Sequence, residues 1–329
     1  MSNNSKLYPL TFRPIYKQKI WGGKKIAESL GRSDAEKNTG ESWELSGVSG
    51  SITSVKNGIL AGRGLDELVK EYKSELLGEK IYSRFGYDFP LLIKFIDAAE
   101  NLSIQVHPGD ELARKRHNSS GKTEMWYILE SEHDSFLING FKPGTNLDKY
   151  RQAVSDHNIL SVLNKEKAKA GDVFFIPAGC VHAIGCGLLL AEIQQTSDIT
   201  YRIYDWDRKD NNGKPRELHT EPAETALDFS ISSSRINYIC KKQNSLESAR
   251  LAACEYFSAD FIRFSHYKPE LSLRNSFTVY IIIEGQAEIK YAGFSEVFSR
   301  GDVVLIPAAL NSIILHSPND KCALLEIYI

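Results

Sequence analysis

The sequence has few cysteines and no pattern that would pair them. Five cysteines occur in 329 residues. An odd number without CxxC spacing is typical of reduced thiols in a cytoplasmic protein and argues against a disulfide framework. Cys180 and Cys186 flank a histidine and are alternative zinc ligands, but their spacing favours small buried thiols.

Long apolar runs and an excess of one charge are also absent. The 40 basic and 42 acidic residues leave a formal net charge of −2, which gives no electrostatic reason to expect nucleic acid or an acidic membrane surface as partner. No apolar run approaches the ~20 residues that span a bilayer. The start, MSNNSKLYPL, lacks the apolar core of a secretory signal. We therefore expect a cytoplasmic protein that binds neither nucleic acid nor membrane.

Most of the sequence consists of short apolar runs separated by turns. Runs such as 173–177 and 303–307 are bounded by glycine and proline, which is typical of a β-barrel or sandwich. Apolar spacings of three and four predict helices over 64–85 and 147–163, with a weaker candidate at 221–229. The length suggests two domains. These patterns predict a mainly β protein with a few inserted α-helices.

An internal repeat supports the two-domain interpretation. The stretch AGDVFFIPAGCVH (170–182) matches RGDVVLIPAALNS (300–312) at a constant offset of 130 residues, and similar strands at 124–130 and 278–284 precede the two copies. The upstream strand ends 41 positions before the glycine in the first copy and 17 before it in the second. The first copy is therefore enlarged by an insertion that includes the predicted helix at 147–163.

The repeated pattern G-D-x-x-x-I-P-x-G-x-x-H resembles the second conserved motif of cupins, which are jelly-roll β-barrels. In cupins the histidine lies at the barrel mouth and binds a metal. The resemblance implies two tandem cupin barrels. Residues 1–230 would form a metal-binding catalytic domain with helical elaborations at about 64–85 and 147–163, and residues 231–329 a degenerate second barrel.

Four residues of the first copy form a candidate metal site. In the segment NLSIQVHPGD, strand alternation places Gln105 and His107 on one face. Glu124 begins the next strong strand, and His182 ends the repeated motif. Imidazole, carboxylate and amide ligands suit a borderline divalent cation such as zinc and leave room for water or substrate.

The second copy serves as an internal control for this site. A single histidine or glutamate near a strand end is usually an ordinary hydrogen-bonded residue. The second copy, however, has Thr278 in place of Glu124 and Ser312 in place of His182. Because it keeps the turn and strand residues without this pair, we expect the chemistry to belong to the first barrel. Of the remaining histidines, only His117, in the basic loop RKRHNSSGK, has a place near the expected mouth.

Several charged residues are candidates for contact with a substrate. Glu192 begins the polar and aromatic segment EIQQTSDITYRIYDWDR, in which Arg202 lies between two tyrosines. A fixed guanidinium suits a phosphate or a charge that develops on a sugar oxygen. Lys122 shares the expected strand face of Glu124. Lys94, within the apolar run LLIKFI, is either a snorkelling edge lysine or a buried functional cation.

Seven stretches together resemble type I mannose-6-phosphate isomerases of the short bacterial form. They are WGG (21–23), GESWELSG (40–47), PLLIKFIDA (90–98), LSIQVHPGD (102–110), GKTEMWYIL (121–129), PAGCVHAIG (177–185) and AEIQQTSDITYRIYDWDR (191–208). Long members of the family carry a helical domain between the last two metal ligands, and the 58 positions from Glu124 to His182 leave no room for it. Ile199 also stands where long members have asparagine.

The resemblance implies an activity and a set of roles. The reaction would interconvert D-mannose 6-phosphate and D-fructose 6-phosphate through a cis-enediol, with one zinc ion per chain. The implied zinc ligands are Gln105, His107, Glu124 and His182; the implied catalytic residues are Arg202, Glu192 and Lys122; and the implied substrate contacts are Lys94, Lys122 and Arg202. Glu192 and Lys122 are equal candidates for the general base. Lys94 and the loop 114–122 are candidates for binding the phosphate.

Two other functions fit the same residues. One is another metal-dependent cupin enzyme, such as an iron-dependent dioxygenase, although a glutamine ligand beside one histidine fits zinc better. The other is a non-catalytic sugar-binding or regulatory double cupin. The oligomeric state, the direction of flux and the tolerance for related sugars are not encoded in any pattern of the sequence.

Overall fold

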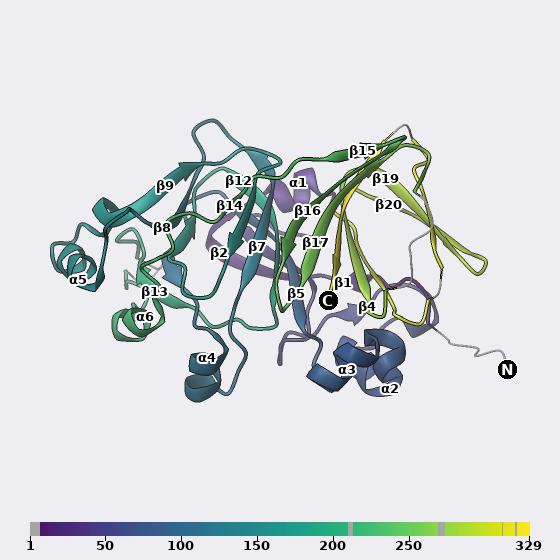
Figure 1. Ribbon diagram of the computed structural model, residues 1–329, viewed down its shortest axis with the longest axis horizontal. Coiled ribbons are helices and arrows are strands. Elements are labelled where there is room, and N and C mark those ends of the chain that lie inside the picture. The colour runs from purple at the N-terminus through teal and green to yellow at the C-terminus, as the bar shows by residue number, and fades with distance from the viewer. Residues whose placement is uncertain (1–6, 210–212, 269–273, 311, 320) are drawn as a thin grey trace. The chain divides into compact units, whose positions relative to one another are not determined.

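The computed structural model describes the chain except for residues 1–6, 210–212, 269–273, 311 and 320 (Figure 1). Its contacts form two compact units. The first unit comprises residues 16–43 and 92–236, and the second comprises the residues before 16, residues 44–91 and residues 237–329. The two copies of the repeat fall into different units. Residues 44–91 group with the C-terminal copy.

Two β-sheets build the first unit. The seven-stranded sheet has the order β14-β10-β7-β12-β5-β2-β3, and the five-stranded sheet has the order β13-β6-β11-β8-β9. The strands are β2 (Ile15–Gly23), β3 (Thr39–Leu45), β5 (Leu91–Ala98), β6 (Ile104–Val106), β7 (Glu124–Ser131), β8 (Phe136–Phe141), β9 (Leu163–Lys167), β10 (Val173–Ile176), β11 (His182–Ile184), β12 (Leu188–Gln195), β13 (Tyr201–Tyr204) and β14 (Arg235–Ile236). The helices are α1 (Lys25–Ser29), α4 (Asp110–His117), α5 (Leu147–Ser155), the 3₁₀ turn η2 (Ile159–Val162) and α6 (Thr220–Ala226).

The core of the first unit lies between its two sheets. Trp126 and Phe174 from the larger sheet pack with Leu137 and Ile184 from the smaller one. A second apolar cluster covers the other face of the smaller sheet, where α5 and α6 pack (Figure 1). This jelly-roll arrangement confirms the predicted mainly β cupin fold, and it gives β6 and β11 an inner and an outer face.

The residues on the outer faces of β6 and β11 identify, by alternation, the residues that point into the barrel. Ile104, Val106 and Ala183 belong to the cluster under the helices. By alternation, Gln105 and His182 therefore point into the barrel. The two are also direct cross-strand partners in the register of β6 and β11.

The two copies of the repeat have the same local structure. Glu124 pairs with Ile176 across β7 and β10. In the second unit, Thr278 pairs with Ile306 across β19 (Thr278–Tyr291) and β21 (Val303–Ile306). The glycines of the two GD turns have φ angles of 87° and 92°, which favour glycine because a side chain clashes with the backbone in this region. The two copies therefore share a local structure as well as a sequence pattern.

The second unit is built around a nine-stranded sheet. Its main path is β15-β16-β17-β23-β19-β22-β18, and β20 and β21 also pair with β19. Its remaining elements are β1 (Phe12–Arg13), β4 (Ser54–Val55), η1 (Gly58–Leu60), α2 (Leu65–Leu77), α3 (Glu79–Phe85), β15 (Lys241–Gln243), β16 (Leu246–Ala253), β17 (Ser258–Phe264), β18 (Tyr267–Lys268), β20 (Phe294–Ser299), β22 (Ile314–His316) and β23 (Cys322–Tyr328).

Two predicted helices are shorter than the sequence pattern indicates. The segment 64–85 forms two helices, because Gly78 adopts a φ of 93° between α2 and α3, outside the helical region. These helices belong to the second unit, so they are not an elaboration of the first barrel. The segment 147–163 is helical only to Ser155, because His157 has a positive φ and η2 and β9 follow. The weaker candidate at 221–229 corresponds to α6.

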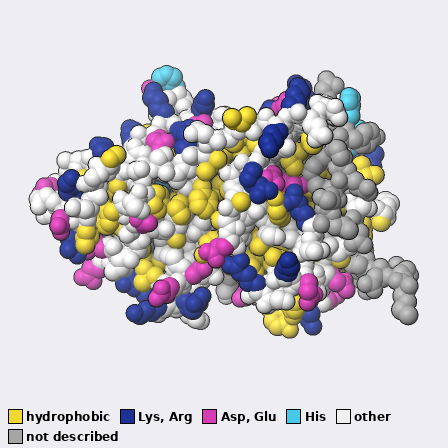
Figure 2. Space-filling view, in the orientation of Figure 1, with side chains coloured by type: hydrophobic (Ala, Val, Ile, Leu, Met, Phe, Trp, Pro, Cys, Tyr) yellow, Lys and Arg dark blue, Asp and Glu magenta, His cyan; other side chains and the backbone are white. Residues whose placement is uncertain are grey.

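The surface and the cysteines agree with the composition. Basic and acidic side chains are interspersed on the described part of the face shown in Figure 2. All five cysteines are free thiols. Cys180 is buried as expected, but the expectation was wrong for Cys186, which is exposed in the turn between β11 and β12. Among the described residues, no helix combines the length and apolar character needed to cross a bilayer.

Candidate metal centre and pocket

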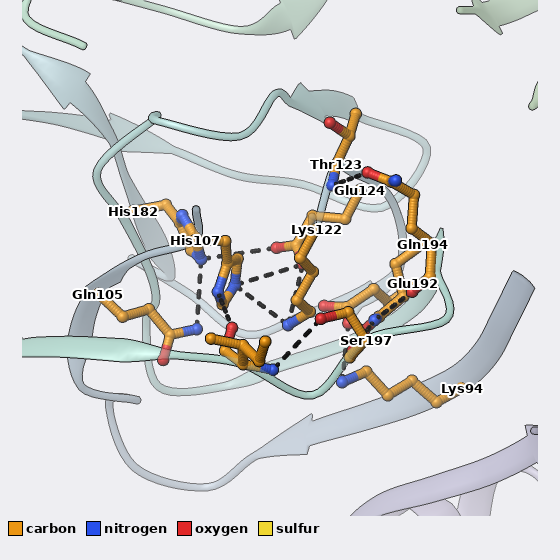
Figure 3. Close-up of polar contacts among 12 residues, drawn as sticks. Lys94, Gln105, His107, Lys122, Thr123, Glu124, His182, Glu192, Gln194 and Ser197 are labelled. Atoms are coloured by element: carbon orange, nitrogen blue, oxygen red, sulfur yellow. Dashed lines mark hydrogen bonds and ion pairs between the residues drawn. The ribbon is translucent and has the colours of Figure 1, made fainter. Parts of the chain in front are cut away.

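Two histidines and one glutamate converge inside the first barrel. His107 Nε2 lies 3.5 Å from Glu124 Oε2, and His182 Nε2 lies 3.5 Å from Glu124 Oε1. One ligand atom from each of the three residues lies within 4.8 Å of the others. All three side chains are at most 1% exposed. Figure 3 shows the three side chains gathered together: Glu124 begins β7, His182 begins β11, and His107 follows the end of β6.

Backbone carbonyls fix the orientation of both imidazoles. His107 Nδ1 lies 2.8 Å from the carbonyl of Ile199, and His182 Nδ1 lies 2.9 Å from that of Cys180. A carbonyl only accepts, so each Nδ1 carries the proton and each Nε2 keeps its lone pair. Histidine ligands of metals are usually held in this way. Both lone pairs therefore face the space beside Glu124.

Gln105 completes the set of four predicted ligands. Its amide nitrogen lies 3.2 Å from His182 Nε2, so the side chain reaches the same point as the two imidazoles. A half-turn of the amide would present its oxygen to a cation instead. The structure thus brings together all four residues that the sequence nominates.

Burial disfavours the charged form of each ionisable ligand candidate in this cluster. Burial, with the neighbouring Glu192 carboxylate adding to it, raises the pKa of Glu124 to about 7. Burial lowers the pKa of His182 to about 4 and also lowers the pKa of His107 well below its ordinary value. Glu124 Oε2 is buried, and its charged neighbour is the Lys122 ammonium at 3.2 Å. A divalent cation would favour the deprotonated form of every one of these groups, so the residues fit a metal.

Lys122 borders the metal cluster. Its Nζ lies 3.1 Å from His107 Nε2 and 3.2 Å from Glu124 Oε2. Its backbone N–H donates to the carbonyl of Pro108, which holds the segment before β7 against the end of β6. The predicted placement of Lys122 on the face of Glu124 therefore agrees with the structure.

Lys94 is a buried cation and not a snorkelling edge lysine. Its Nζ lies 2.8 Å from Glu192 Oε1, and Glu192 Oε2 accepts a hydrogen bond of 2.8 Å from Trp126 Nε1. Burial alone would lower the pKa of Lys94, but Glu192 and then Glu41 outweigh it and raise that pKa above its ordinary value. Burial would likewise raise the pKa of Glu192, but Lys94 outweighs it and the pKa falls. The pair is therefore ionised.

Glu41 is a further buried charge close to the Lys94–Glu192 pair, and it was not among the residues predicted from the sequence. Glu41, on β3, lies 3.2 Å from Lys19 Nζ and accepts a hydrogen bond of 2.7 Å from Trp43 Nε1. Burial opposes its ionisation, but Lys94 and Lys19 prevail and lower the pKa of Glu41 to about 2. The signal in the sequence was its place in the stretch GESWEL (40–45), every residue of which the structure buries.

Arg202 lies on β13, directly opposite Gln105 on β6. Its Nη1 donates to the carbonyl of Glu217 at 2.8 Å, while its Nε is buried without a hydrogen-bond partner among the described residues. Burial, with Arg216 as the next cause, lowers the pKa of Arg202. A guanidinium with one unused buried donor is suited to an anionic oxygen.

The segment between His107 and Glu124 is held by hydrogen bonds to Gln195, and the helix α4 within it carries basic side chains. The Gln195 amide donates to Asp110 at 3.0 Å and accepts from the Thr123 N–H at 2.9 Å, a link that the sequence did not suggest. The arginines and the lysine of α4 are exposed. His117 Nε2 lies 2.8 Å from the Tyr201 hydroxyl and does not join the metal cluster.

The second unit keeps one part of this site and lacks another. Glu326 pairs with Tyr280 in the register of β23 and β19, as Glu192 pairs with Trp126 in that of β12 and β7. The Tyr280 hydroxyl donates to Glu326 at 3.1 Å, and Arg274 contacts the same carboxylate at 2.5 Å. A buried acid bonded to an aromatic residue is thus common to both units, whereas the metal-ligand pair is not.

Comparison with known proteins gives consistent matches. A family model described as phosphomannose isomerase type I, catalytic domain, matches residues 10–142. Mannose-6-phosphate isomerase ManA of Bacillus subtilis (strain 168) is 35% identical over 303 residues, which cover 92% of this chain and 94% of that protein. A mannose-6-phosphate isomerase of Streptococcus mutans is 32% identical over 304 residues, with the same shares of 92% and 94%.

Solved structures agree with these sequence matches. The crystal structure of the mannose 6-phosphate isomerase from Bacillus subtilis has a TM-score of 0.89 and 31% identity, and the match covers 98% of this chain and 100% of that one. A mannose 6-phosphate isomerase described as holo and zinc-bound has a TM-score of 0.77 at 16% identity, with coverage of 98% and 99%. The second match, at that low identity, shows a shared fold.

Proposed function

The chain belongs to the type I mannose-6-phosphate isomerase family, and from this premise we propose that it interconverts D-mannose 6-phosphate and D-fructose 6-phosphate with one zinc ion per chain. The observation that carries the proposal is the orientation of the two imidazoles. His107 and His182 both turn the Nε2 lone pair toward the Glu124 carboxylate, and all three side chains are at most 1% exposed. A purely structural pair of histidines has no need for such an arrangement.

Gln105, His107, Glu124 and His182 would hold the zinc ion. Two imidazole nitrogens with one carboxylate and one amide oxygen suit zinc, and such a set leaves a position for substrate. When bound, zinc supplies a Lewis acid beside the sugar oxygens at C1 and C2. The zinc-bound relative of the same fold supports this choice of metal.

The protein side chains would move the protons. The reaction removes the proton from C2 of mannose 6-phosphate and returns a proton to C1, through a cis-enediol. Glu192 is an ionised buried carboxylate, because Lys94 holds it as an ion pair at 2.8 Å, and we assign it the role of proton acceptor. Lys122 would donate hydrogen bonds to the sugar oxygens at C1 and C2, and through them favour the enediol.

Arg202 and the basic segment 114–122 would bind the anionic parts of the substrate. Arg202 has an unused buried Nε donor, which suits a phosphate oxygen or the developing enediolate. The positive charge of Lys94 is already balanced by the carboxylates of Glu192 and Glu41. Lys94 would therefore act indirectly, by balancing the charge of these two carboxylates beside the substrate. The exposed cations of α4 would meet the phosphate from the solvent side.

A coupled assay tests this function. The purified chain is given mannose 6-phosphate, and the fructose 6-phosphate formed is measured before chelation, after chelation and after zinc is restored. We expect turnover that chelation abolishes and zinc restores. Full turnover in protein shown by metal analysis to be metal-free would overturn the zinc proposal, and no turnover at any metal content would overturn the activity.

A further inference from the structure

Gln194 is a buried amide whose orientation is fixed by the backbone. Its Nε2 donates to the carbonyl of Gln195 at 2.8 Å and to that of Ser197 at 2.6 Å. Because both partners are carbonyls, which only accept, the nitrogen must face them. The oxygen, Oε1, is therefore held on the other side of the amide and cannot exchange places with the nitrogen without the loss of two hydrogen bonds.

The amide oxygen of Gln194 has no donor from the protein. Gln194 is 0% exposed, and Oε1 has no hydrogen-bond partner among the described residues. An acceptor left in this state costs about 1–3 kcal/mol, so a buried acceptor without a partner calls for an explanation. The donors two residues to either side of Glu124 have contacts of their own: Lys122 contacts His107 and Glu124, and the Trp126 indole donates to Glu192.

The position of Gln194 in the barrel indicates what the missing donor is. Gln194 on β12 is the direct cross-strand partner of Glu124 on β7. Alternation along β12 places it on the same face as Glu192, so Gln194 lies beside a metal ligand and next to the assigned proton acceptor (Figure 3). An acceptor between two carboxylates repels further anionic oxygens and favours a neutral hydroxyl donor.

We propose that Gln194 Oε1 accepts a hydrogen bond from a hydroxyl group of the open-chain sugar, and that Gln194 is a specificity-determining residue of the pocket. This inference rests on the proposed isomerase function. The relevant hydroxyls are those at C3, C4 and C5, because the oxygens at C1 and C2 undergo the reaction and the oxygen at C6 carries the phosphate. A site built to pair with a hydroxyl rejects an analogue that lacks it, because its own acceptor is then left unpaired.

The test compares mannose 6-phosphate with its 3-deoxy, 4-deoxy and 5-deoxy analogues in the zinc-loaded protein. In the unchanged chain we expect one of the three analogues to have a kcat/KM lower by ~10-fold, as an unpaired buried acceptor implies. This measurement needs no variant. If no analogue differs from the parent sugar while the parent turns over, the proposal is overturned and the isomerase function stands. If no sugar turns over, the proposed function itself has failed.

The variant Gln194→Met keeps the approximate side-chain volume and removes the acceptor, together with the Nε2 donor that bonds the carbonyls of Gln195 and Ser197. We expect its KM for mannose 6-phosphate to rise by ~10-fold with a smaller change in kcat, and its discrimination against the deoxy analogue to fall towards one. The matched control is Gln195→Met, since the amide of Gln195 is paired with Asp110 and Thr123 within the protein. That variant should keep the discrimination. Unchanged discrimination in a folded, zinc-loaded Gln194→Met protein overturns the proposal.

Discussion

His107 and His182 present the same ring nitrogen to opposite oxygens of one carboxylate, each at 3.5 Å. They reach this arrangement from different elements, His182 from the start of β11 and His107 from the turn after β6. Because separate backbone carbonyls hold the two rings, neither depends on the other for its orientation. Removal of one should therefore leave the other in place but unable to retain a metal alone.

The first prediction concerns His182→Ala. Removal of a residue that only supports a metal ligand already lowers metal affinity by ~10- to 100-fold. Because His182 is itself a proposed ligand, we expect zinc affinity to fall by more than ~100-fold. Isomerase activity should be lost with the metal, while the fold survives. Metal analysis, activity and far-UV circular dichroism measure this. The control is His133→Ala, since that side chain is 94% exposed and pairs only with Asp134. Zinc retained by the His182→Ala protein would contradict the assignment.

The second prediction concerns the pH dependence of stability through Glu41. Its folded pKa is about 2 against 4.5 as the ordinary value, so it stabilises the fold above pH 4.5 and this contribution is lost as the pH falls towards 2. Glu41→Gln should lower the free energy of unfolding at pH 7 by about 3 kcal/mol, at 1.36 kcal/mol per pKa unit.

Urea unfolding at pH 7 and pH 3 measures this effect. The difference between the Glu41→Gln protein and the unchanged one should be smaller at pH 3. Glu36→Gln is the matched control, because Glu36 is exposed and surface ion pairs contribute little. A difference that is equal at both pH values would show that the destabilisation comes from packing and not from the charge of Glu41.

The third prediction separates metal binding from turnover. Arg202→Ala should keep zinc and lower kcat by ~100-fold or more, as expected when a charge-stabilising donor is removed. Stopped assays at saturating mannose 6-phosphate, with metal analysis of the same samples, measure this. Arg151→Ala is the comparison, since Arg151 is exposed and contacts only Glu224. An unchanged kcat in the Arg202→Ala protein would remove Arg202 from the mechanism.

The fourth prediction uses the two units as mutual controls. Glu192→Gln and Glu326→Gln alter equivalent buried acids, and each loses a charge that pairs with a cation. Both should lower thermal stability, because each removes a carboxylate that pairs with a cation. The effect should be larger for Glu192→Gln, since Lys94 is buried whereas Arg274 is 28% exposed. Only Glu192→Gln should lower kcat, by ~100-fold or more, if Glu192 accepts the substrate proton. Equal activity of the two variants would move the general base to another residue, with Lys122 the next candidate.

Local chemistry made much of the fold predictable. Alternation along NLSIQVHPGD determined that Gln105 and His107 share a face, and the GD turns determined where the repeated strands begin. These features depend only on the strand period and on turn conformations that favour glycine. The helix ends were less predictable, because the apolar spacing continues through Gly78 and past Ser155 while the backbone does not.

The sequence by itself therefore determined the barrel fold, its duplication and the four candidate ligands, since short-range periodicity and the internal comparison encode them. Tertiary structure alone decided which imidazole nitrogen faces the metal position, that Lys94 is paired with Glu192, and that Gln194 holds an unpaired acceptor. These properties depend on backbone carbonyls and charges supplied by strands that are distant in sequence. No local pattern specifies such partners, because they meet only when the sheets close around the core.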